Sequence, residues 1–206
     1  MDVANPIAAV SPSLEGEVLR VLSGTTTGLT GRQVAAMTGR SSHSGVLDAL
    51  HRLADQGLVN KVELNRAYLF SLNREHLAAD AVMELAGLRT KLVNELRRVV
   101  AAWEVAPVHV SLFGSTARGD GDAHSDIDLL AVRPEAVAHE DEIWNGQLDE
   151  LRESIQRWTG NTASLHVHAE QEIARLRVDR PPIVAELLSD SILIAGISAS
   201  EMLDRP

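Results

Sequence analysis

The stretch SLFGSTARGDGDAHSDIDLLAV at residues 111–132 constrains the fold of this chain more than any other. Apolar residues lie at both ends of it, and between them are a Gly-Ser step, a polar loop and two aspartates separated by one residue. The pattern predicts two buried strands, with a turn at Gly114 and Ser115 after the first. Because side chains alternate along a strand that rises ~3.3 Å per residue, Asp126 and Asp128 are expected on one face, about 7 Å apart.

Carboxylates held on one face repel each other unless a cation lies between them. Mg²⁺ prefers oxygen ligands and commonly combines one or two carboxylates with substrate phosphates. Backbone N–H groups in the turn at Gly114 and Ser115 suit an anion, and the Arg118 guanidinium suits bidentate contact with phosphate. The residues therefore predict a site for a metal ion and a phosphorylated ligand. The alternative is a surface hairpin that carries Asp-x-Asp without a ligand.

Composition narrows the class of protein. The chain has 206 residues, of which 45% are apolar, and no cysteine, so a core can form while disulfides and thiolate chemistry are excluded. No run approaches the ~18 apolar residues of a membrane span, and no basic region followed by an apolar run stands at the start. We expect a cytoplasmic protein without membrane contact.

Charge is distributed unevenly along the chain. The net charge is −10, yet residues 1–74 hold seven basic and six acidic residues, whereas the remainder holds 12 basic and 23 acidic residues. These counts give +1 for the first part and −11 for the second. Such asymmetry predicts two units with different partners.

The first unit reads as short helices followed by a hairpin. Helical spacing over residues 14–22 is followed by Thr30 and Gln33, which form a capping-box pattern before a helix that ends at Gly39. A third helix is expected from about residues 42–44 to Gly57. The runs LVNKVEL and AYLFSL then read as strands joined by a tight turn at residues 65–66.

This order resembles the winged helix-turn-helix family over residues 14–72. In that family the third helix enters the major groove of DNA and the hairpin contacts the backbone. The resemblance implies double-stranded DNA as a partner, with residues near the bases and near the phosphates. Those near the bases would be Arg40, Ser42, His43 and Ser44, and those near the phosphates Lys61 and Arg66. The alternative is a winged helix used for dimerisation or protein contact, because a charge of +1 is small for phosphate neutralisation.

Residues 75–104 predict one continuous helix, since apolar positions recur every three or four residues. Such a helix either pairs with a copy of itself, giving a homodimer, or packs as a connector on its own neighbours. The expected boundaries are a leader at 1–13, a winged helix at 14–73, a connecting or dimerisation helix at 74–106, a second domain at 107–198 and a tail at 199–206. The second domain reads as a small mixed β-sheet with flanking helices, so the fold class is α+β with two domains.

The segment GSTARGDGDAHSDIDLL closely resembles the signature of the DNA polymerase β-like nucleotidyltransferase superfamily, and is most similar to its minimal nucleotidyltransferase branch. The resemblance implies transfer of a nucleoside monophosphate from a nucleoside triphosphate, with ATP as the expected substrate and Mg²⁺ or Mn²⁺ as cofactor. By residue, Gly114, Ser115, Arg118 and Ser125 would serve nucleotide binding, with Ser125 starting the strand and orienting the loop. Asp126 and Asp128 would ligate the metal. Catalysis of this kind rests on positioning and charge neutralisation.

One expected catalytic group is missing from the pattern. Most active members of the superfamily carry a third carboxylate on the next central strand, which here reads SLHVHA and holds no acid. Alternation places Ser164, His166 and His168 on one face, so His166 is the best match for the third catalytic position. Imidazole is a poorer ligand for Mg²⁺ and lacks the negative charge. Alternatively these histidines line an exposed cleft, and Glu170 or Glu172 supplies the acid.

Whether the chain is an active enzyme therefore stays open at this stage, and there are three hypotheses. It is a nucleotidyltransferase that modifies a protein, an RNA end or a small molecule, a transcription regulator that senses a nucleotide without turnover, or an antitoxin-like module that neutralises a partner.

Overall fold

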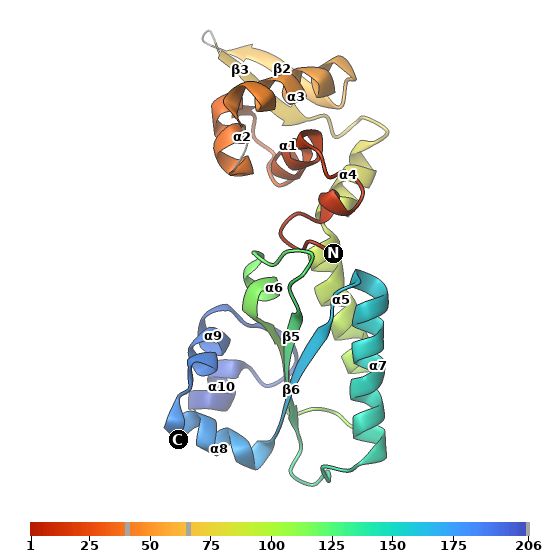
Figure 1. Cartoon of the computed structure of the whole chain (residues 1–206), viewed down its shortest axis with the longest axis vertical. Coiled ribbons are helices and arrows are strands. Elements are labelled where there is room, and N and C mark those ends of the chain that lie inside the picture. The colour runs from red at the N-terminus through yellow and green to blue at the C-terminus, as the bar shows by residue number, and fades with distance from the viewer. Residues whose placement is uncertain (40–41, 65–66, 205–206) are drawn as a thin grey trace. The chain divides into compact units, whose positions relative to one another are not determined.

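The computed structural model describes residues 1–39, 42–64 and 67–204. Internal contacts divide the chain into two compact units. The N-terminal unit is Asn5–Leu88, and the C-terminal unit combines Met1–Ala4 with Arg89–Pro206. Figure 1 shows the elements of both units. No helix in the described part of the chain is both long and apolar enough to span a bilayer.

The N-terminal unit has the order of helices and strands that the sequence predicts. Its elements are η1 (Pro6–Ala9), α1 (Leu14–Ser23), β1 (Leu29–Thr30), α2 (Gly31–Thr38), α3 (His43–Asp55), β2 (Val59–Leu64), β3 (Ala67–Leu72) and α4 (Ala79–Ala86). β1, β3 and β2 form an antiparallel sheet in that order. The strand β1 is an addition, since the sequence pattern indicated only the hairpin.

Local capping explains where α2 and α3 begin. The Thr30 hydroxyl accepts a hydrogen bond from the Gln33 N–H, and the Gln33 side chain accepts one from the Thr30 N–H, which is the predicted capping box. Ser42 caps α3 by accepting from the Gly45 N–H at 3.1 Å. Gly39 ends α2 in the left-handed conformation, with φ of 78°. The core of the unit includes Leu22, Val34, Leu50 and Phe70, each 1% exposed or less.

The continuous helix predicted over residues 75–104 is wrong. The structure has α4, which ends at Ala86, and α5 (Leu88–Ala101), with Gly87 between them. Each helix buries its apolar side chains in its own unit: Val82 of α4 joins the N-terminal core, and Leu92 and Leu96 of α5 join the C-terminal core. The apolar stripe on which dimerisation was predicted is therefore largely used within the chain.

The C-terminal unit is a four-stranded mixed sheet with helices on both faces. Its further elements are β4 (His109–Phe113), α6 (Gly114–Arg118), β5 (Ile127–Arg133), α7 (Glu142–Thr159), β6 (Ala163–Ala169), α8 (Glu170–Asp179), α9 (Pro182–Asp190), β7 (Ile192–Gly196) and α10 (Ala199–Asp204). The strand order is β6-β5-β4-β7. β5 pairs parallel with β6, and the other pairs are antiparallel.

Alternation along β5 separates the two faces of this sheet. Ile127 and Leu129 point into a core shared with α5 and α7. Leu130 and Val132 point the other way, into a core shared with α8, α9 and α10. Figure 1 shows these two sets of helices on opposite sides of the sheet. Asp128 lies on the same side of the sheet as Leu130 and opposite Ile127 and Leu129, as alternation along the strand predicts.

Residues of the predicted leader and of the predicted tail are buried in the cores of the two units. Val3 is 3% exposed in the C-terminal core, and Ile7 is 2% exposed in the N-terminal core. At the other end, α10 buries Met202 and Leu203 against Leu130 and Val132. These short apolar segments therefore pack against residues that are distant in sequence. Their own sequence pattern, which has no clear periodicity, did not indicate this packing.

Candidate functional site

Gly114 lies where β4 ends and α6 begins, directly against Asp128. Its φ is +68°, a conformation that L side chains rarely adopt. A β-carbon on residue 114 would lie 2.6 Å from Oδ2 of Asp128. Both observations require glycine here, and its missing side chain is what lets the backbone approach the carboxylate.

The two aspartates flank the first residue of β5. Asp126 is exposed and precedes the strand, Ile127 is buried, and Asp128 is half-buried. Asp128 is in register with Phe113 on β4 and with Ser164 on β6. The Thr116 hydroxyl donates to the Asp126 carbonyl at 3.5 Å, which ties α6 to the start of the strand.

The environment of Asp128 disfavours its negative charge. Burial raises the pKa of this carboxyl above its usual value, and the charges of Asp126 and Glu186 raise it further. The His166 ring and a hydrogen bond from Ser164 act in the opposite direction on the Asp128 pKa and do not cancel the rise. A cation bound beside Asp128 would relieve this cost.

The structure brings His166 to the face that carries Asp128, as predicted. Its Nε2 is 3.4 Å from the Ser164 hydroxyl, and its ring meets that of Phe113 edge to face at 5.4 Å between centroids. His168, on the same face, instead lies 3.7 Å from the Glu172 carboxylate. His166 is the histidine whose charge acts on Asp128.

The two glutamates proposed as replacements for the missing acid begin α8. Glu172 accepts a hydrogen bond from the Ala169 N–H at 2.8 Å, so its carboxylate caps that helix. Glu170 is exposed at the first position of α8. The acid whose charge acts on Asp128 from another element is Glu186 of α9. Sequence reasoning missed it, because no local pattern links α9 to residues 114–128.

Arg118 is held by two acids. Its Nε donates to Asp120 at 3.3 Å, and its Nη1 lies 3.9 Å from Glu186. A phosphate that binds Arg118 must therefore compete with these carboxylates.

Ser125 lies in the loop before β5 and does not start the strand, which begins at Ile127. Its hydroxyl donates to Asp122 at 3.0 Å and accepts from the Asp122 N–H at 2.9 Å. The buried Asn161 amide donates to the Ser125 carbonyl at 2.9 Å. Ser125 therefore shapes the loop, consistent with part of its predicted role.

A comparison with known protein families finds a match in the same region. Residues 91–190 match the family model described as the nucleotidyltransferase domain. Over these residues the C-terminal unit is similar to that family. The match includes Gly114, Ser115, Arg118, Ser125, Asp126, Asp128 and His166.

Two further comparisons were made, one with curated proteins and one with solved structures. The comparison with curated proteins finds no match. A solved structure described as a predicted DNA-binding transcriptional regulator from E. coli is similar over 42% of this chain and 81% of that chain, at 23% identity and with a TM-score of 0.32. At this TM-score the likeness carries no argument about either unit.

The side chains at the aspartate site suit a hard divalent cation. Asp126 and Asp128 offer hard oxygen ligands, and Gly114 leaves space beside Oδ2 of Asp128 that a β-carbon would fill. In residues 1–39, 42–64 and 67–204, no three acidic or histidine side chains are grouped closely enough to hold a metal ion by themselves. Asp126 and Asp128 therefore fit an ion whose other ligands would be supplied by a bound phosphate or by water.

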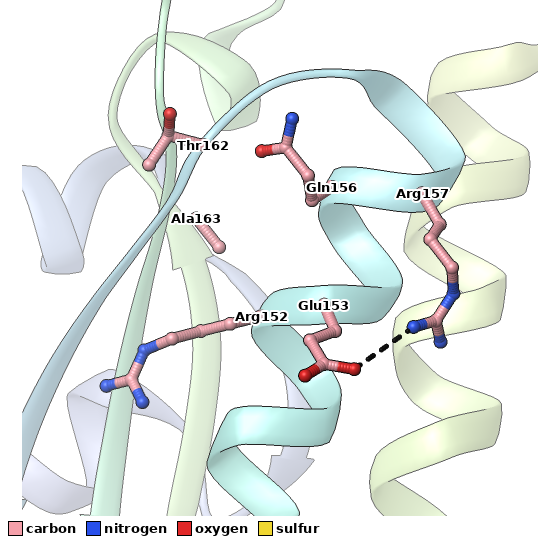
Figure 2. A pocket seen from close by; sticks show the side chains of 6 residues that line it. All are labelled: Arg152, Glu153, Gln156, Arg157, Thr162 and Ala163. Carbon is pink, nitrogen blue, oxygen red and sulfur yellow. Dashed lines mark hydrogen bonds and ion pairs between the residues drawn. The ribbon is translucent and has the colours of Figure 1, made fainter.

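A hollow in the C-terminal unit lies away from the aspartates. It is lined by Arg152, Glu153, Gln156, Arg157, Thr162 and Ala163, on α7 and at the start of β6. Figure 2 shows these side chains and the ion pair of Arg157 with Glu153, which is 3.3 Å long. Arg152 is paired with Asp149 at 2.6 Å. Because α7 covers the face of the sheet opposite Asp128, this hollow is not part of the aspartate site.

The residues predicted to contact DNA lie in the N-terminal unit, and their side chains differ in exposure and in bonding partners. Arg40 and Arg66 lie outside the described residues. Ser42 uses its hydroxyl as the cap of α3, whereas His43 and Ser44 are exposed at the start of that helix. Lys61 lies 4.1 Å from the centre of the Tyr68 ring and 3.2 Å from Nδ1 of His51.

A hollow beside these residues is also lined by Arg32, a basic residue that sequence reasoning did not assign to DNA contact. Arg32, His43 and Tyr68 line it together with Thr30, Gly31, Leu47, Ala67 and Phe70. It lies between the first residues of α2 and α3 and the strand β3, so Arg32 is brought beside His43. The two positions are eleven residues apart in sequence, and only the packing of α2 against α3 indicates that they are neighbours.

Proposed function

We propose that the C-terminal unit transfers a nucleoside monophosphate from a nucleoside triphosphate, with ATP as substrate, to the hydroxyl group of an acceptor, and releases pyrophosphate. The observation that supports the proposal is the close approach of Gly114 to Asp128, because it places the turn that begins at Gly114 beside a carboxylate. The acceptor is a protein, an RNA end or a small molecule.

Each residue has a role in this proposal. Gly114 and Ser115 hold the triphosphate through the turn that they begin, and Arg118 exchanges its carboxylate partners for phosphate oxygens. Asp126 and Asp128 would hold Mg²⁺ or Mn²⁺, which would supply neutralisation of the charge on the phosphates and on the attacking and leaving oxygens. His166 accepts the proton of the acceptor hydroxyl, a contribution that is typically worth ~10²–10⁴-fold in rate.

Nucleotide binding is tested by thermal unfolding with ATP and Mn²⁺. Wild-type protein should be stabilised, because a ligand that binds only the folded state raises the free energy of unfolding. Asp128→Asn should lose this stabilisation, while Glu150→Gln, which changes an exposed acid on α7, should keep it. Equal stabilisation of both variants would contradict the role of Asp128.

A second candidate function is nucleotide sensing without turnover. The observation that favours it is the absence, in the described part of the chain, of a third acid grouped with Asp126 and Asp128. On this hypothesis the protein binds the triphosphate and responds to it, but labelled nucleotide is never transferred.

For the N-terminal unit we propose binding to double-stranded DNA through the start of α3 and the hairpin. The support is the exposure of His43 and Ser44, the position of Lys61 on β2, and Arg32 beside His43. A mobility shift with duplex DNA tests this, and the salt dependence described in the Discussion separates phosphate contacts from protein contacts.

A further inference from the structure

Arg89 begins the second segment of the C-terminal unit, and its side chain reaches the end of α6. Its Nε donates to the Thr116 carbonyl at 2.9 Å, and its Nη2 donates to the Ala117 carbonyl. A β-carbon on Gly119 would lie 3.3 Å from the Arg89 guanidinium carbon. Arg89 lies outside residues 91–190, so the family match says nothing about it.

These bonds satisfy groups that a helix leaves open. The last carbonyls of a helix have no partner within it, and a cation beside them also complements the helix dipole. The guanidinium presents its donors in a fixed fork, so it holds two neighbouring carbonyls at once. Gly119 then continues in the left-handed conformation, and the N–H groups of Gly119 and Asp120 both donate to the Ser115 carbonyl, at 2.9 and 3.0 Å.

The segment Met1–Ala4 holds the same turn from its other end. The Ala4 N–H donates to the Gly121 carbonyl at 3.1 Å. A β-carbon on Gly121 would lie 2.9 Å from the Ser115 hydroxyl and 3.0 Å from Cγ2 of Val3. Ala4 and Arg89, which belong to different segments of the C-terminal unit, therefore both contact the turn 114–121.

We propose that Arg89 is a positioning residue for nucleotide binding, which acts by fixing the end of α6 and thereby the turn 114–121. This inference rests on the proposed function, in which Gly114 and Ser115 of that turn hold the triphosphate. Arg89 itself does not touch the nucleotide. Hydrogen bonds to charged groups are strong enough that their loss should weaken triphosphate binding roughly tenfold.

The first test needs no ligand. Amide hydrogen exchange in residues 114–121 is compared between wild type, Arg89→Ala, Arg89→Lys and the control Arg98→Ala, in which an exposed arginine of the same helix loses its pairing with Glu95. Arg89→Ala should exchange faster in this turn while α7 and β5 exchange as in wild type. Arg89→Lys should be intermediate, because lysine keeps the charge but not the fork. Exchange at 114–121 that is unchanged in Arg89→Ala would overturn the positioning role.

The second test titrates ATP with Mn²⁺ at a temperature far below unfolding, so that a general loss of stability does not affect the result. Arg89→Ala should bind roughly tenfold more weakly, Arg89→Lys less so, and Arg98→Ala as wild type. If Arg89→Ala does not fold, the titration of Arg89→Lys decides the outcome by itself. An affinity of Arg89→Lys for ATP equal to that of wild type would then overturn the inference. Failure of wild-type protein to bind ATP would instead overturn the proposed function, whereas the exchange result would still decide whether Arg89 orders the turn.

Discussion

The α-carbon of Gly114 faces the carboxylate of Asp128 so closely that a β-carbon on residue 114 would lie 2.6 Å from Oδ2. Gly114→Ala should therefore displace Asp128, strain a backbone with φ of +68° and abolish stabilisation by ATP and Mn²⁺.

A second glycine provides the control. Gly146 lies inside α7 and nothing lies within 4 Å of a β-carbon placed there. Gly146→Ala should stabilise the protein by about 0.5–1 kcal/mol and leave nucleotide binding unchanged. Unfolding curves of both variants, with and without ATP and Mn²⁺, check the pair. Full nucleotide-dependent stabilisation of Gly114→Ala would refute the contact as a requirement.

Asp128 should make stability depend on pH in metal-free solution. Since the folded state raises the pKa of this carboxyl above its ordinary 3.8, ionised Asp128 costs stability above that pH. The cost develops as pH rises through the interval between the unfolded and folded pKa values. In EDTA, Asp128→Asn should thus unfold at a higher temperature than wild type at pH 7, and the difference should shrink toward pH 4. A lower unfolding temperature for the variant at pH 7 would contradict this.

His109 should make the protein more stable as pH rises, whereas the ionisation of Asp128 makes it less stable. It is fully buried, with Nδ1 2.6 Å from the Ile197 carbonyl and Nε2 2.8 Å from the Ser111 hydroxyl. Burial lowers its pKa from the ordinary 6.5, so the unfolded chain takes up a proton more readily than the folded protein does. The stability that neutral His109 contributes is present above about pH 6.5 and is lost as pH falls below that value.

The measurement is thermal unfolding between pH 8 and pH 5 for wild type and His109→Gln. Wild type should lose more stability than the variant below pH 6.5, because glutamine has no proton to take up. Parallel curves would show that another group sets the acid limit.

DNA binding should depend steeply on salt. Each phosphate contact contributes about −0.9 to the slope of log K against log salt concentration. Replacing Arg32 and Lys61 together with alanine should weaken a duplex mobility shift and make the slope shallower by about 1.8. Arg52→Ala is the control, since Arg52 is already paired with Glu15 at 2.5 Å. A shift that is insensitive to salt and to the double substitution would indicate a protein-binding unit instead.

His166 should set the rate of transfer. His166→Ala should reduce transfer, and His166→Asp should increase it by adding a carboxylate beside Asp126 and Asp128. Nucleotide affinity should change little in His166→Ala, which separates a proton-transfer role from binding. Wild-type transfer that is indifferent to both substitutions would direct attention to Glu186, whose charge also acts on Asp128.

What the sequence predicted well was local. The cap at Thr30 and Gln33 and the left-handed Gly39 each depend on residues a few positions apart, so pattern alone located them. The face shared by Asp128 and His166 followed from alternation along two strands. Gly87 was overlooked because one glycine inside a helical stripe costs only about 1 kcal/mol and does not by itself predict a break.

Contacts between distant segments could not be predicted in this way. Glu186 reaches the site only because α9 packs beside α6, and Arg89 contacts Thr116 across 27 positions of the chain. The burial of Met202 and Leu203 likewise depends on the face of the sheet that α10 covers. Periodicity describes one element at a time, whereas these contacts arise from tertiary packing.

Transfer of labelled nucleotide tests the central claim most directly. The protein is incubated with lysate, Mg²⁺ or Mn²⁺, and ATP labelled either at the α-phosphate or at the γ-phosphate, alongside Asp126→Asn and Asp128→Asn. Transfer of a nucleoside monophosphate predicts that a macromolecule or small molecule acquires the α-label but not the γ-label, that EDTA prevents labelling, and that both variants fail to label. Labelling from the γ-phosphate, or α-labelling that survives in Asp128→Asn, would contradict the account.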